Sequence, residues 1–294
     1  MKVNKWLSLN TTSLLGKTIA VTGTTGGLGK EICKYLASLN ANLILMDRNK
    51  KRSENFKNEL LTLYPSITVK CINIDLVEFD SVKNATNQLL LEDIDIFIHN
   101  AGAYSIPRCI TSIGYDNVFQ INFISPYYII NKILPKLREK NGKVVVVGSI
   151  AHNYSKINLN DIDFRNHKKA SRVYGNAKRF LMFSLYELFK NETKVGLSIT
   201  HPGITFTNIT AHYPKLIYMI IKNPMKIIFM KPSKASLSII KGVFENTSYH
   251  TWFGPKLFNI WGMPKYQKLK TCSINESNKI DELAKSIILE LNKL

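Results

Sequence analysis

The segment that decides the fold is KTIAVTGTTGGLGKEICKYL, residues 17–36. Its beginning, Lys17–Thr22, is apolar and β-branched, as is typical of a buried strand. From Leu28 to Leu39 the apolar residues recur at helical spacing. The glycine-rich turn between them, TGTTGGLG at Thr22–Gly29, lets an anion such as a pyrophosphate approach free backbone N–H groups at the helix N-terminus. A tight turn without a ligand is the alternative, but the position at the first strand–helix junction favours a phosphate site.

Apolar strands then alternate with helical segments as far as residue 200. Continuous apolar strands joined by helices indicate an α/β fold, a doubly wound parallel sheet covered on both faces. No linker, repeat or low-complexity segment divides the chain, so we expect one Rossmann-type domain over residues 1–294. Its cofactor-binding half spans about residues 14–140, and its catalytic and substrate half about residues 141–294. Besides Lys17–Thr22 the predicted strands are Asn42–Met46, Thr68–Ile74, Ile94–His99, Lys143–Val147 and Val195–Thr200, and the later predicted helices are Lys50–Tyr64, Phe79–Leu91, Gly114–Lys140 and Ser171–Phe189.

Composition excludes several other classes of protein. Hydrophobic residues make up 45% of the 294-residue chain and charged residues 21%, which argues against disorder. The four cysteines have no C-x-x-C spacing and the histidines have no metal-ligand spacing, so no metal site is expected. No apolar run reaches the roughly 20 residues of a spanning helix, and the N-terminus lacks the apolar core of a signal peptide. We therefore expect a cytoplasmic protein.

The net charge of +19 is compatible with a polyanionic partner or an acidic membrane surface. The basic residues are spread along the chain, however, which favours a lysine-rich solvated surface. No zinc-finger spacing or aromatic RNA-binding signature is present, so no nucleic-acid partner is expected.

The spacing Thr22-Gly23-x-x-x-Gly27-x-Gly29 resembles the TGxxxGxG motif of the short-chain dehydrogenase/reductase family. Later motifs extend the resemblance over about residues 14–244: HNAG at His99–Gly102 is similar to the family's NNAG, Asp75 belongs to NIDL, and HPG at His201–Gly203 precedes Thr207. The resemblance implies an NAD(P) cofactor. The residues that it implies for cofactor binding are Thr22, Gly23, Gly27, Leu28, Gly29, Asp47, Arg48, Asp75, Leu76, Asn100, Ala101, Gly102, Tyr174, Lys178, Pro202, Gly203 and Thr207.

Asp47 and Arg48, which close the second strand, give opposite indications about the cofactor. A carboxylate there can accept hydrogen bonds from the adenosine ribose and repels a 2′-phosphate, which favours NAD. An arginine can pair with that phosphate, which favours NADP. Because Asp47 falls where the family selects NAD, we expect NAD, with NADP as the alternative.

The chemistry is expected from Tyr174-x-x-x-Lys178, whose two side chains share one helix face. A nearby ammonium lowers the pKa of a phenol, which suits Tyr174 to general acid/base catalysis. Ser149 follows an apolar strand directly, at the edge where ligands bind, and its hydroxyl would polarise the substrate oxygen; a capping serine is the alternative. The resemblance also implies that Lys178 holds the nicotinamide ribose and that Asn122 holds a water linking Lys178 to solvent. Ser155 is a weaker candidate than Ser149.

His99, Gly148 and Ala177 depart from the commonest family residues, but none of these changes removes a proposed catalytic group. The long interval between Ser149 and Tyr174, with NLNDIDF, resembles the branch of retinol-dehydrogenase-like and protochlorophyllide-reductase-like members. The expected function is hydride transfer between nicotinamide and a carbonyl or alcohol. A catalytically silent dinucleotide sensor on the same fold is the main alternative.

The family places its substrate lid after His201-Pro-Gly, here about residues 204–240. Amphipathic helices packed on the core, an apolar cover over a lipophilic substrate, and peripheral membrane contact through lysines all remain open for this segment. The tail with Trp252 and Trp261 is expected at the same end. The resemblance further implies a homodimer or homotetramer that pairs through the helices at 114–140 and 171–189, where Phe180, Phe183 and Phe189 are either apolar interface or core.

Overall fold

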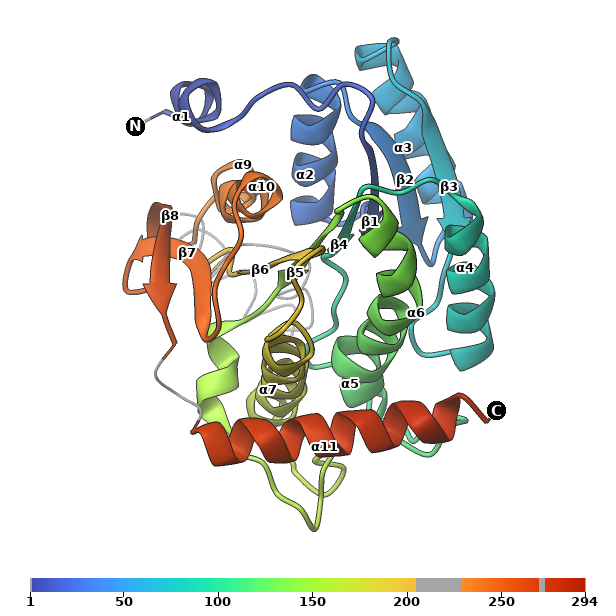
Figure 1. Cartoon of the computed structure of the whole chain (residues 1–294), viewed down its shortest axis with the longest axis vertical. Coiled ribbons are helices and arrows are strands. Elements are labelled where there is room, and N and C mark those ends of the chain that lie inside the picture. The colour runs from blue at the N-terminus through green and yellow to red at the C-terminus, as the bar shows by residue number, and fades with distance from the viewer. Residues whose placement is uncertain (1, 205–228, 270–272, 294) are drawn as a thin grey trace, which may run out of the picture.

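A computed structural model describes residues 2–204, 229–269 and 273–293. Its centre is an eight-stranded sheet in the order β3-β2-β1-β4-β5-β6-β7-β8 (Figure 1). Neighbouring strands run parallel throughout except for the antiparallel pair of β7 and β8. This arrangement confirms the predicted doubly wound sheet. The strands are β1 (Thr18–Thr22), β2 (Asn42–Asp47), β3 (Val69–Asn73), β4 (Ile96–His99), β5 (Lys143–Val147), β6 (Gly196–Thr200), β7 (Thr251–Leu257) and β8 (Trp261–Lys268).

Helices cover both faces of the sheet because side chains alternate along each strand. In β1, Ile19 and Val21 pack toward α1, α2, α3 and α10, whereas Ala20 packs toward α4, α6, α7 and α11. Figure 1 shows α2 and α10 on one side of the sheet and α6, α7 and α11 on the other. The helices are α1 (Val3–Asn10), α2 (Gly27–Ser38), α3 (Lys50–Leu63), α4 (Phe79–Leu91), α5 (Asn117–Phe119), α6 (Ser125–Glu139), α7 (Ala170–Leu188), α9 (Pro232–Ala235), α10 (Leu237–Phe244) and α11 (Ile274–Leu291), with a π-helical turn at Gln120–Ile124 and a 3₁₀ turn at Ile150–Tyr154.

Two parts of the fold differ from the sequence-based expectation. The single helix predicted over 114–140 begins only at Asn117 and is interrupted by the π-helical turn Gln120–Ile124. The expected lid over 204–240 includes 205–228, which lie outside the described residues, and ends inside α10. Leu237 and Ile240 of α10 are fully buried in the core on the α2 side of the sheet. This end of the segment is therefore part of the domain core, and its helix connects to β7.

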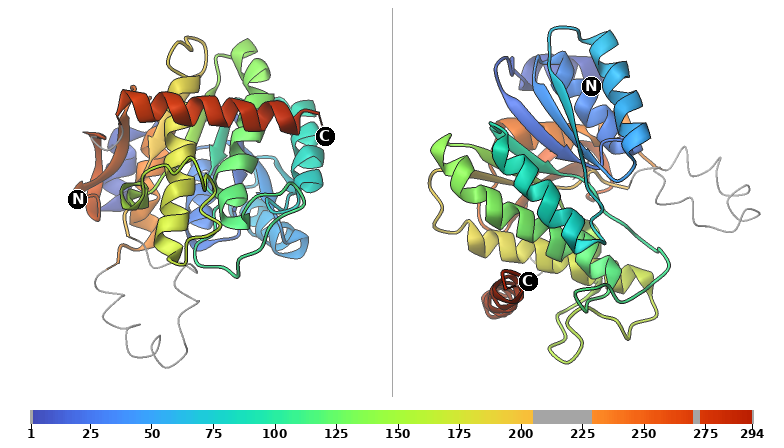
Figure 2. Two further views of the ribbon diagram at one scale, coloured as in Figure 1. Left: turned by 90° about the horizontal axis from the view of Figure 1, so that it is seen from below. Right: turned by 90° about the vertical axis from the view of Figure 1, so that its right-hand side faces the viewer.

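The tail forms three elements that the sequence did not predict, β7, β8 and α11. Trp252 lies fully buried in β7, which is next to β6, and Trp261 begins the antiparallel edge strand β8. After them α11 crosses the outer side of α7 and reaches toward α6 (Figure 2). Its buried residues, among them Ile280 and Ala284, join the same core as α7.

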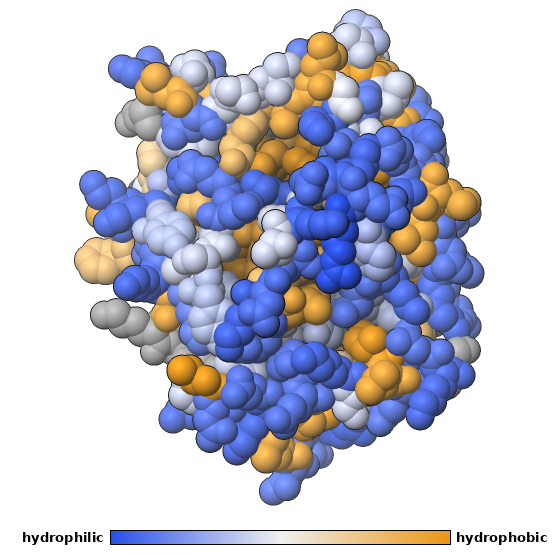
Figure 3. All heavy atoms as spheres, viewed as in Figure 1, coloured by the Kyte–Doolittle hydropathy of each residue, from blue (hydrophilic) through white to orange (hydrophobic). Residues whose placement is uncertain are grey.

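Helix α11 therefore covers part of the surface that was expected to pair two subunits. Phe180 and Phe183 are fully buried and Phe189 is nearly so, which makes all three core residues and not an exposed interface. The face of the molecule in Figure 3 is largely hydrophilic, with its hydrophobic residues in small separate groups. Among the described helices, none is both long and apolar enough to cross a membrane.

Candidate active site

One cleft of about 680 Å³ at the carboxyl ends of the strands brings the predicted site residues together. It runs from the second strand's end, with Asp47, Arg48 and Asp75, past the glycine-rich turn to Ser149 and Tyr174. The other predicted residues that line it are Thr22, Gly23, Gly27, Leu28, Gly29, Leu76, Asn100, Ala101, Gly102, Lys178, Pro202 and Gly203. Asn122 lies just behind the lining, and Thr207 lies outside the described residues.

The glycine-rich turn is held tightly against the end of β4. Gly23 has a φ of +71°, and a Cβ there would lie 2.9 Å from the Cα of Ala101, so both conformation and space require glycine. Thr22 Oγ1 accepts hydrogen bonds from the N–H groups of Asn100 (3.1 Å) and Ala101 (3.0 Å). The Asn100 amide returns hydrogen bonds to the carbonyl oxygens of Thr22 (3.1 Å) and Gly23 (3.0 Å). The side chain of Asn100 therefore holds the backbone of the turn in place.

The same network fixes the state of His99, the residue that departs from the family motif. Thr22 Oγ1 lies 3.1 Å from His99 Nδ1, and because it already accepts two N–H groups, its hydroxyl proton is donated to that nitrogen. Burial, followed by the nearby Lys178, holds the His99 pKa well below its ordinary value. His99 is thus neutral, with its proton on Nε2.

Asp47 lines the cleft, but both of its carboxylate oxygens are engaged by the turn and by Ser53. Its Oδ1 accepts hydrogen bonds from the N–H and the hydroxyl of Thr25, both at 3.1 Å. Its Oδ2 accepts hydrogen bonds from the hydroxyls of Thr24 and Ser53. A carboxylate offers about four lone-pair sites, so these contacts use its full capacity. Asp47 is only 4% exposed and serves to hold the turn.

Arg48, in contrast, is free to reach a ligand at this end of the cleft. Its side chain is 75% exposed and, within the described residues, makes one long ion pair, 3.9 Å from its Nε to Asp75 Oδ2. Arg52, in the first turn of α3, also lines the cleft and was not predicted. Its position four residues after Arg48, close to the end of the same strand, was the signal that could have identified it.

Ser149, Tyr174 and Lys178 meet at the other end of the cleft. Ser149 follows β5 and caps the 3₁₀ turn by accepting the N–H of Ala151 (3.2 Å), and its side chain also hydrogen-bonds Tyr174. Tyr174 and Lys178 lie on α7, with the ammonium nitrogen 5.8 Å from the centre of the phenol ring. Lys178 is 2% exposed, and its Nζ donates to the carbonyl oxygen of Val147 (3.0 Å).

Burial dominates the ionisation of this pair. It raises the pKa of Tyr174 to about 12, although the hydrogen bond from Ser149 opposes the change. It lowers the pKa of Lys178 to about 7. The lowering of the Tyr174 pKa that was expected from Lys178 is not the net result, because burial raises this pKa.

Asn122 lies in the π-helical turn and is fully buried. Its amide donates to the carbonyl oxygens of Ala103 and Val118, both at 2.8 Å, and its Oδ1 accepts the N–H of Ala103 at 3.3 Å. A Cβ on Gly102 would lie 2.8 Å from this Oδ1 and 3.6 Å from Lys178 Nζ. Asn122 thus braces the segment beside Lys178 through its side chain.

Several lining residues were missed by sequence reasoning, most of them around the phenol end. Tyr104 sets its ring at 84° to that of Tyr174, with 5.4 Å between ring centres. Tyr104 is the second residue after the HNAG motif, and this position is the signal that could have identified it. The other unpredicted residues nearby are Ile150, Ala151, Tyr154, Ser171, His201, Ile204 and Phe229.

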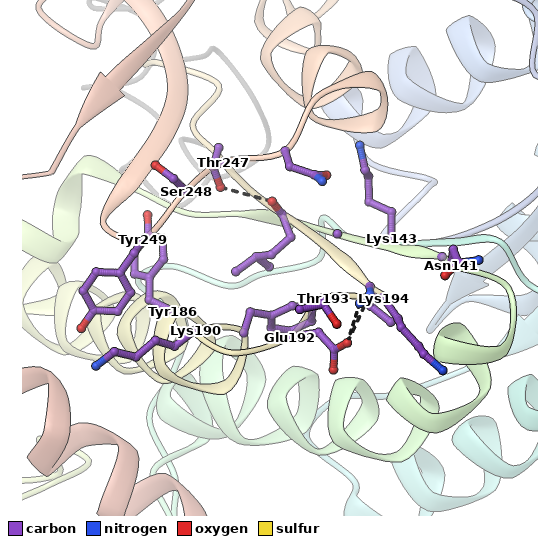
Figure 4. A pocket seen from close by; sticks show the side chains of 16 residues that line it. Asn141, Lys143, Tyr186, Lys190, Glu192, Thr193, Lys194, Thr247, Ser248 and Tyr249 are labelled. Atoms are coloured by element: carbon purple, nitrogen blue, oxygen red, sulfur yellow. Dashed lines mark hydrogen bonds between the residues drawn. The ribbon is translucent and has the colours of Figure 1, made fainter.

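A second pocket, of about 470 Å³, opens beside the start of β5 and β6, at the opposite edge of the sheet (Figure 4). It contains none of the predicted site residues. The ammonium groups of Lys143, Lys190 and Lys194 point away from one another in Figure 4 and do not converge on a common point. The candidate active site is therefore the cleft at the carboxyl ends of the strands.

Comparison with known proteins agrees with this geometry. Residues 17–161 match the family model of the short chain dehydrogenases. The chain is 30% identical over 213 residues to the short-chain dehydrogenase TIC 32 A, chloroplastic, of Brassica napus, covering 66% of each chain. It is 28% identical over 214 residues to retinol dehydrogenase 14 of Mus musculus, covering 67% of this chain and 64% of the mouse protein. The match thus spans less than two thirds of the length of either relative.

Among solved structures, an uncharacterised protein from Mycobacterium paratuberculosis superposes with a TM-score of 0.74 over 97% of both chains, at 20% identity. This likeness concerns the fold, and it extends to nearly the whole chain. The family model matches the part that carries the glycine-rich turn, the HNAG segment and Ser149, and the curated relatives include retinol dehydrogenases, as the long interval after Ser149 had suggested. The chain belongs to the short-chain dehydrogenase/reductase family.

Proposed function

We propose that the protein is an NAD(P)-dependent oxidoreductase that interconverts an alcohol and a carbonyl compound. The observation that carries this proposal is the meeting of Tyr174, Ser149 and Lys178 in the same cleft as the glycine-rich turn. Membership in the family supports the same reaction class.

The residues of the cleft fit a dinucleotide. Gly29 allows the first turn of α2 to approach the glycine-rich turn, because a Cβ there would lie 2.1 Å from the Gly23 carbonyl oxygen. The N-terminus of α2 would hold the pyrophosphate, Asp75 and Leu76 would face the adenine end, and Lys178 would hold the nicotinamide ribose. When bound, the dinucleotide would supply or accept the hydride.

The chain's own residues would handle the proton. Tyr174 would donate its hydroxyl proton to the carbonyl oxygen in reduction and accept a proton in alcohol oxidation. Ser149, which already hydrogen-bonds Tyr174, would hold the same oxygen from the other side. Because burial raises the Tyr174 pKa to about 12, the tyrosine is protonated at neutral pH and can donate its proton.

A lipophilic substrate is supported by the side chains around Tyr174. Tyr104, Ile150 and Tyr154 line the cleft there, and Ile204 and Phe229 line it from the two ends of the segment that includes residues 205–228. Pockets lined mainly by apolar and aromatic side chains favour ligands of the same kind. We propose an aliphatic or isoprenoid-like alcohol or aldehyde as the class to test first.

We further propose that NADP is preferred over NAD. The expectation of NAD depended on Asp47 as a ribose ligand, and the turn occupies both of its oxygens. Arg48 and Arg52 are the positively charged groups that line this end of the cleft. A charge-assisted hydrogen bond to the 2′-phosphate contributes about 1.5–3 kcal/mol, which corresponds to roughly 10- to 100-fold in affinity.

Fluorescence titration with NADPH and NADH tests this preference. Arg52→Ala should weaken NADPH binding about 10-fold or more and leave NADH binding unchanged. Lys51→Ala is the matched control, since it removes one exposed positive charge from the same helix without touching the cleft. Tighter binding of NADH than of NADPH by the wild type would contradict the proposal.

Turnover of alcohols and aldehydes with both cofactors separates the enzyme from a silent sensor. The proposed function predicts absorbance change of the nicotinamide with at least one lipophilic substrate, and its loss in Tyr174→Phe. Dinucleotide binding without turnover of any substrate would instead favour the sensor.

A further inference from the structure

Arg179, the residue after Lys178 on α7, is unusual in being almost completely buried. It is 1% exposed, so its charge needs a partner inside the protein. Glu276 provides one: Arg179 Nε lies 2.7 Å from Glu276 Oε1 and Arg179 Nη2 lies 2.6 Å from Glu276 Oε2. This bidentate pairing is the strongest geometry between an arginine and a carboxylate.

Glu276 comes from the first turn of α11, far from α7 in sequence. Ser273 caps that helix by accepting the N–H of Glu276 (3.2 Å), which fixes the position of the glutamate backbone. Figure 2 shows α11 lying across α7, and the ion pair is at the start of this crossing. The pair therefore ties the C-terminal helix to the helix that carries Tyr174 and Lys178.

The same two side chains also hold the segment that carries Ser149. Arg179 Nη1 donates to the carbonyl oxygen of His152 (3.0 Å), and Glu276 Oε1 accepts the N–H of Ile157 (3.2 Å). His152 Nδ1 in turn lies 2.6 Å from the carbonyl oxygen of Ser149. The backbone between Ser149 and Ile157 is thus attached to the ion pair at two points.

This segment packs closely on α7. A Cβ on Gly175 would lie 2.3 Å from the carbonyl oxygen of Ala151, and Ser155 Oγ donates to the carbonyl oxygen of Arg172 (2.7 Å). Any shift of the segment therefore changes the separation of Ser149 from Tyr174. Misplacement of a catalytic group by about 1 Å can cost on the order of 100-fold in rate.

We propose that Glu276 is a positioning residue, and that α11 completes the active site by holding Ser149 against Tyr174 through Arg179. The inference rests on the proposed oxidoreductase function. Glu276 does not line the cleft, so its effect on catalysis passes through Arg179 and the backbone at 149–157. It should leave the glycine-rich turn, and hence cofactor binding, unaffected.

The test compares Glu276→Gln with Glu282→Gln, which removes the same charge from an exposed position on the same helix. Glu276→Gln should lower kcat about 10- to 100-fold while the Kd for the cofactor changes less than about 3-fold. The pH profile of alcohol oxidation should move to higher pH, because the hydrogen bond from Ser149 lowers the Tyr174 pKa and would be weakened. Glu282→Gln should behave as the wild type.

A double-mutant cycle separates positioning from general stability. If Glu276 acts through Ser149, Glu276→Gln should have little further effect on kcat in a Ser149→Ala background. Equal, additive losses in both backgrounds would overturn the proposal, as would a Glu276→Gln enzyme with wild-type kcat and pH profile.

Arg179→Lys provides the second variant if Glu276→Gln fails to fold, since it keeps the positive charge but loses the bidentate hydrogen bonding. It should show the same loss of kcat and the same cycle with Ser149→Ala, with cofactor affinity as the check on folding. A wild-type kcat in folded Arg179→Lys would reject the inference. Failure of the proposed function itself is distinguishable, because the wild type would then show no turnover.

Discussion

Acidification should destabilise the protein because two histidines are buried in neutral form beside the active site. His152 is fully buried and His201 is 3% exposed, and both rings pack on Trp252, at 5.4 Å edge-on and 4.9 Å stacked respectively. Burial lowers the pKa of His152 from 6.5 to about 4 and that of His201 from 6.5 to about 3. We take a decrease in pH from 7.5 to 4.5 as the perturbation.

The sign follows from proton uptake. Between the two pKa values of each histidine the unfolded chain binds more protons than the folded one, so the free energy of unfolding is highest above pH 6.5 and decreases as the pH falls. At about 1.36 kcal/mol for each pKa unit, the two groups together remove about 5 kcal/mol between pH 7.5 and 4.5. This is comparable to the whole stability of many domains, which lies at about 5–15 kcal/mol. His99 changes in the same direction, so the loss is a lower bound.

Urea unfolding followed by tryptophan fluorescence at several pH values between 7.5 and 4.5 measures this loss. In a His152→Gln/His201→Gln variant the decrease should be smaller by about 5 kcal/mol, whatever the variant's stability at pH 7.5. If the double variant and the wild type lose the same free energy, or if NMR shows both imidazoles titrating near their ordinary pKa, the reasoning is refuted.

Other predictions concern the cleft. Tyr174→Phe should reduce turnover by at least about 100-fold with cofactor affinity nearly unchanged, in steady-state and fluorescence assays; near-wild-type turnover would show that another group moves the proton. Lys178→Ala should weaken both turnover and cofactor binding in the same assays, and an unchanged Kd would remove its proposed ribose contact. Gly29→Ala should weaken cofactor binding about 10-fold or more, because its Cβ would lie 2.1 Å from the Gly23 carbonyl oxygen; equal affinities would mean that the turn adapts freely. Ultraviolet titration of the ligand-free protein against Tyr174→Phe should show no Tyr174 ionisation below about pH 11, since burial raises its pKa to about 12.

The sequence was sufficient for the part of the fold with strong local patterns. Runs such as Val144–Val147 and the turn at Thr22–Gly29 predicted strands β1 to β6 and the edge where the site lies. Strands β7 and β8 were missed because Pro255 and Pro264 interrupt the apolar pattern. Pro264 lies in the edge strand and Pro255 lies at a register shift, and proline is tolerated in both places. The positions of Ser149 and Tyr174 were predictable from motifs, and the structure places them in one cleft.

The direction of a side chain could not be predicted in the same way. Asp47 occupies the expected position, but its orientation depends on hydroxyls and an N–H that only the folded turn brings together. The partner of Arg179 lies on a helix nearly a hundred residues further along the chain, at Glu276, and no local pattern relates the two. The cytoplasmic location and the oligomeric state stay predictions.

The π-helical turn at Gln120–Ile124 divides one long helical segment into two parts. The side chains of the two parts point in directions that one continuous α-helix would not give. Each residue of an α-helix turns the chain by about 100°, so a turn that takes in an additional residue rotates the later part of the helix relative to the earlier part. The turn itself holds Asn122 against Ala103, and the part after it directs Tyr127 into the core. A chain with one residue fewer here would have to give up one of these orientations. No side-chain substitution could restore it, because the information lies in the number of residues and not in their kind.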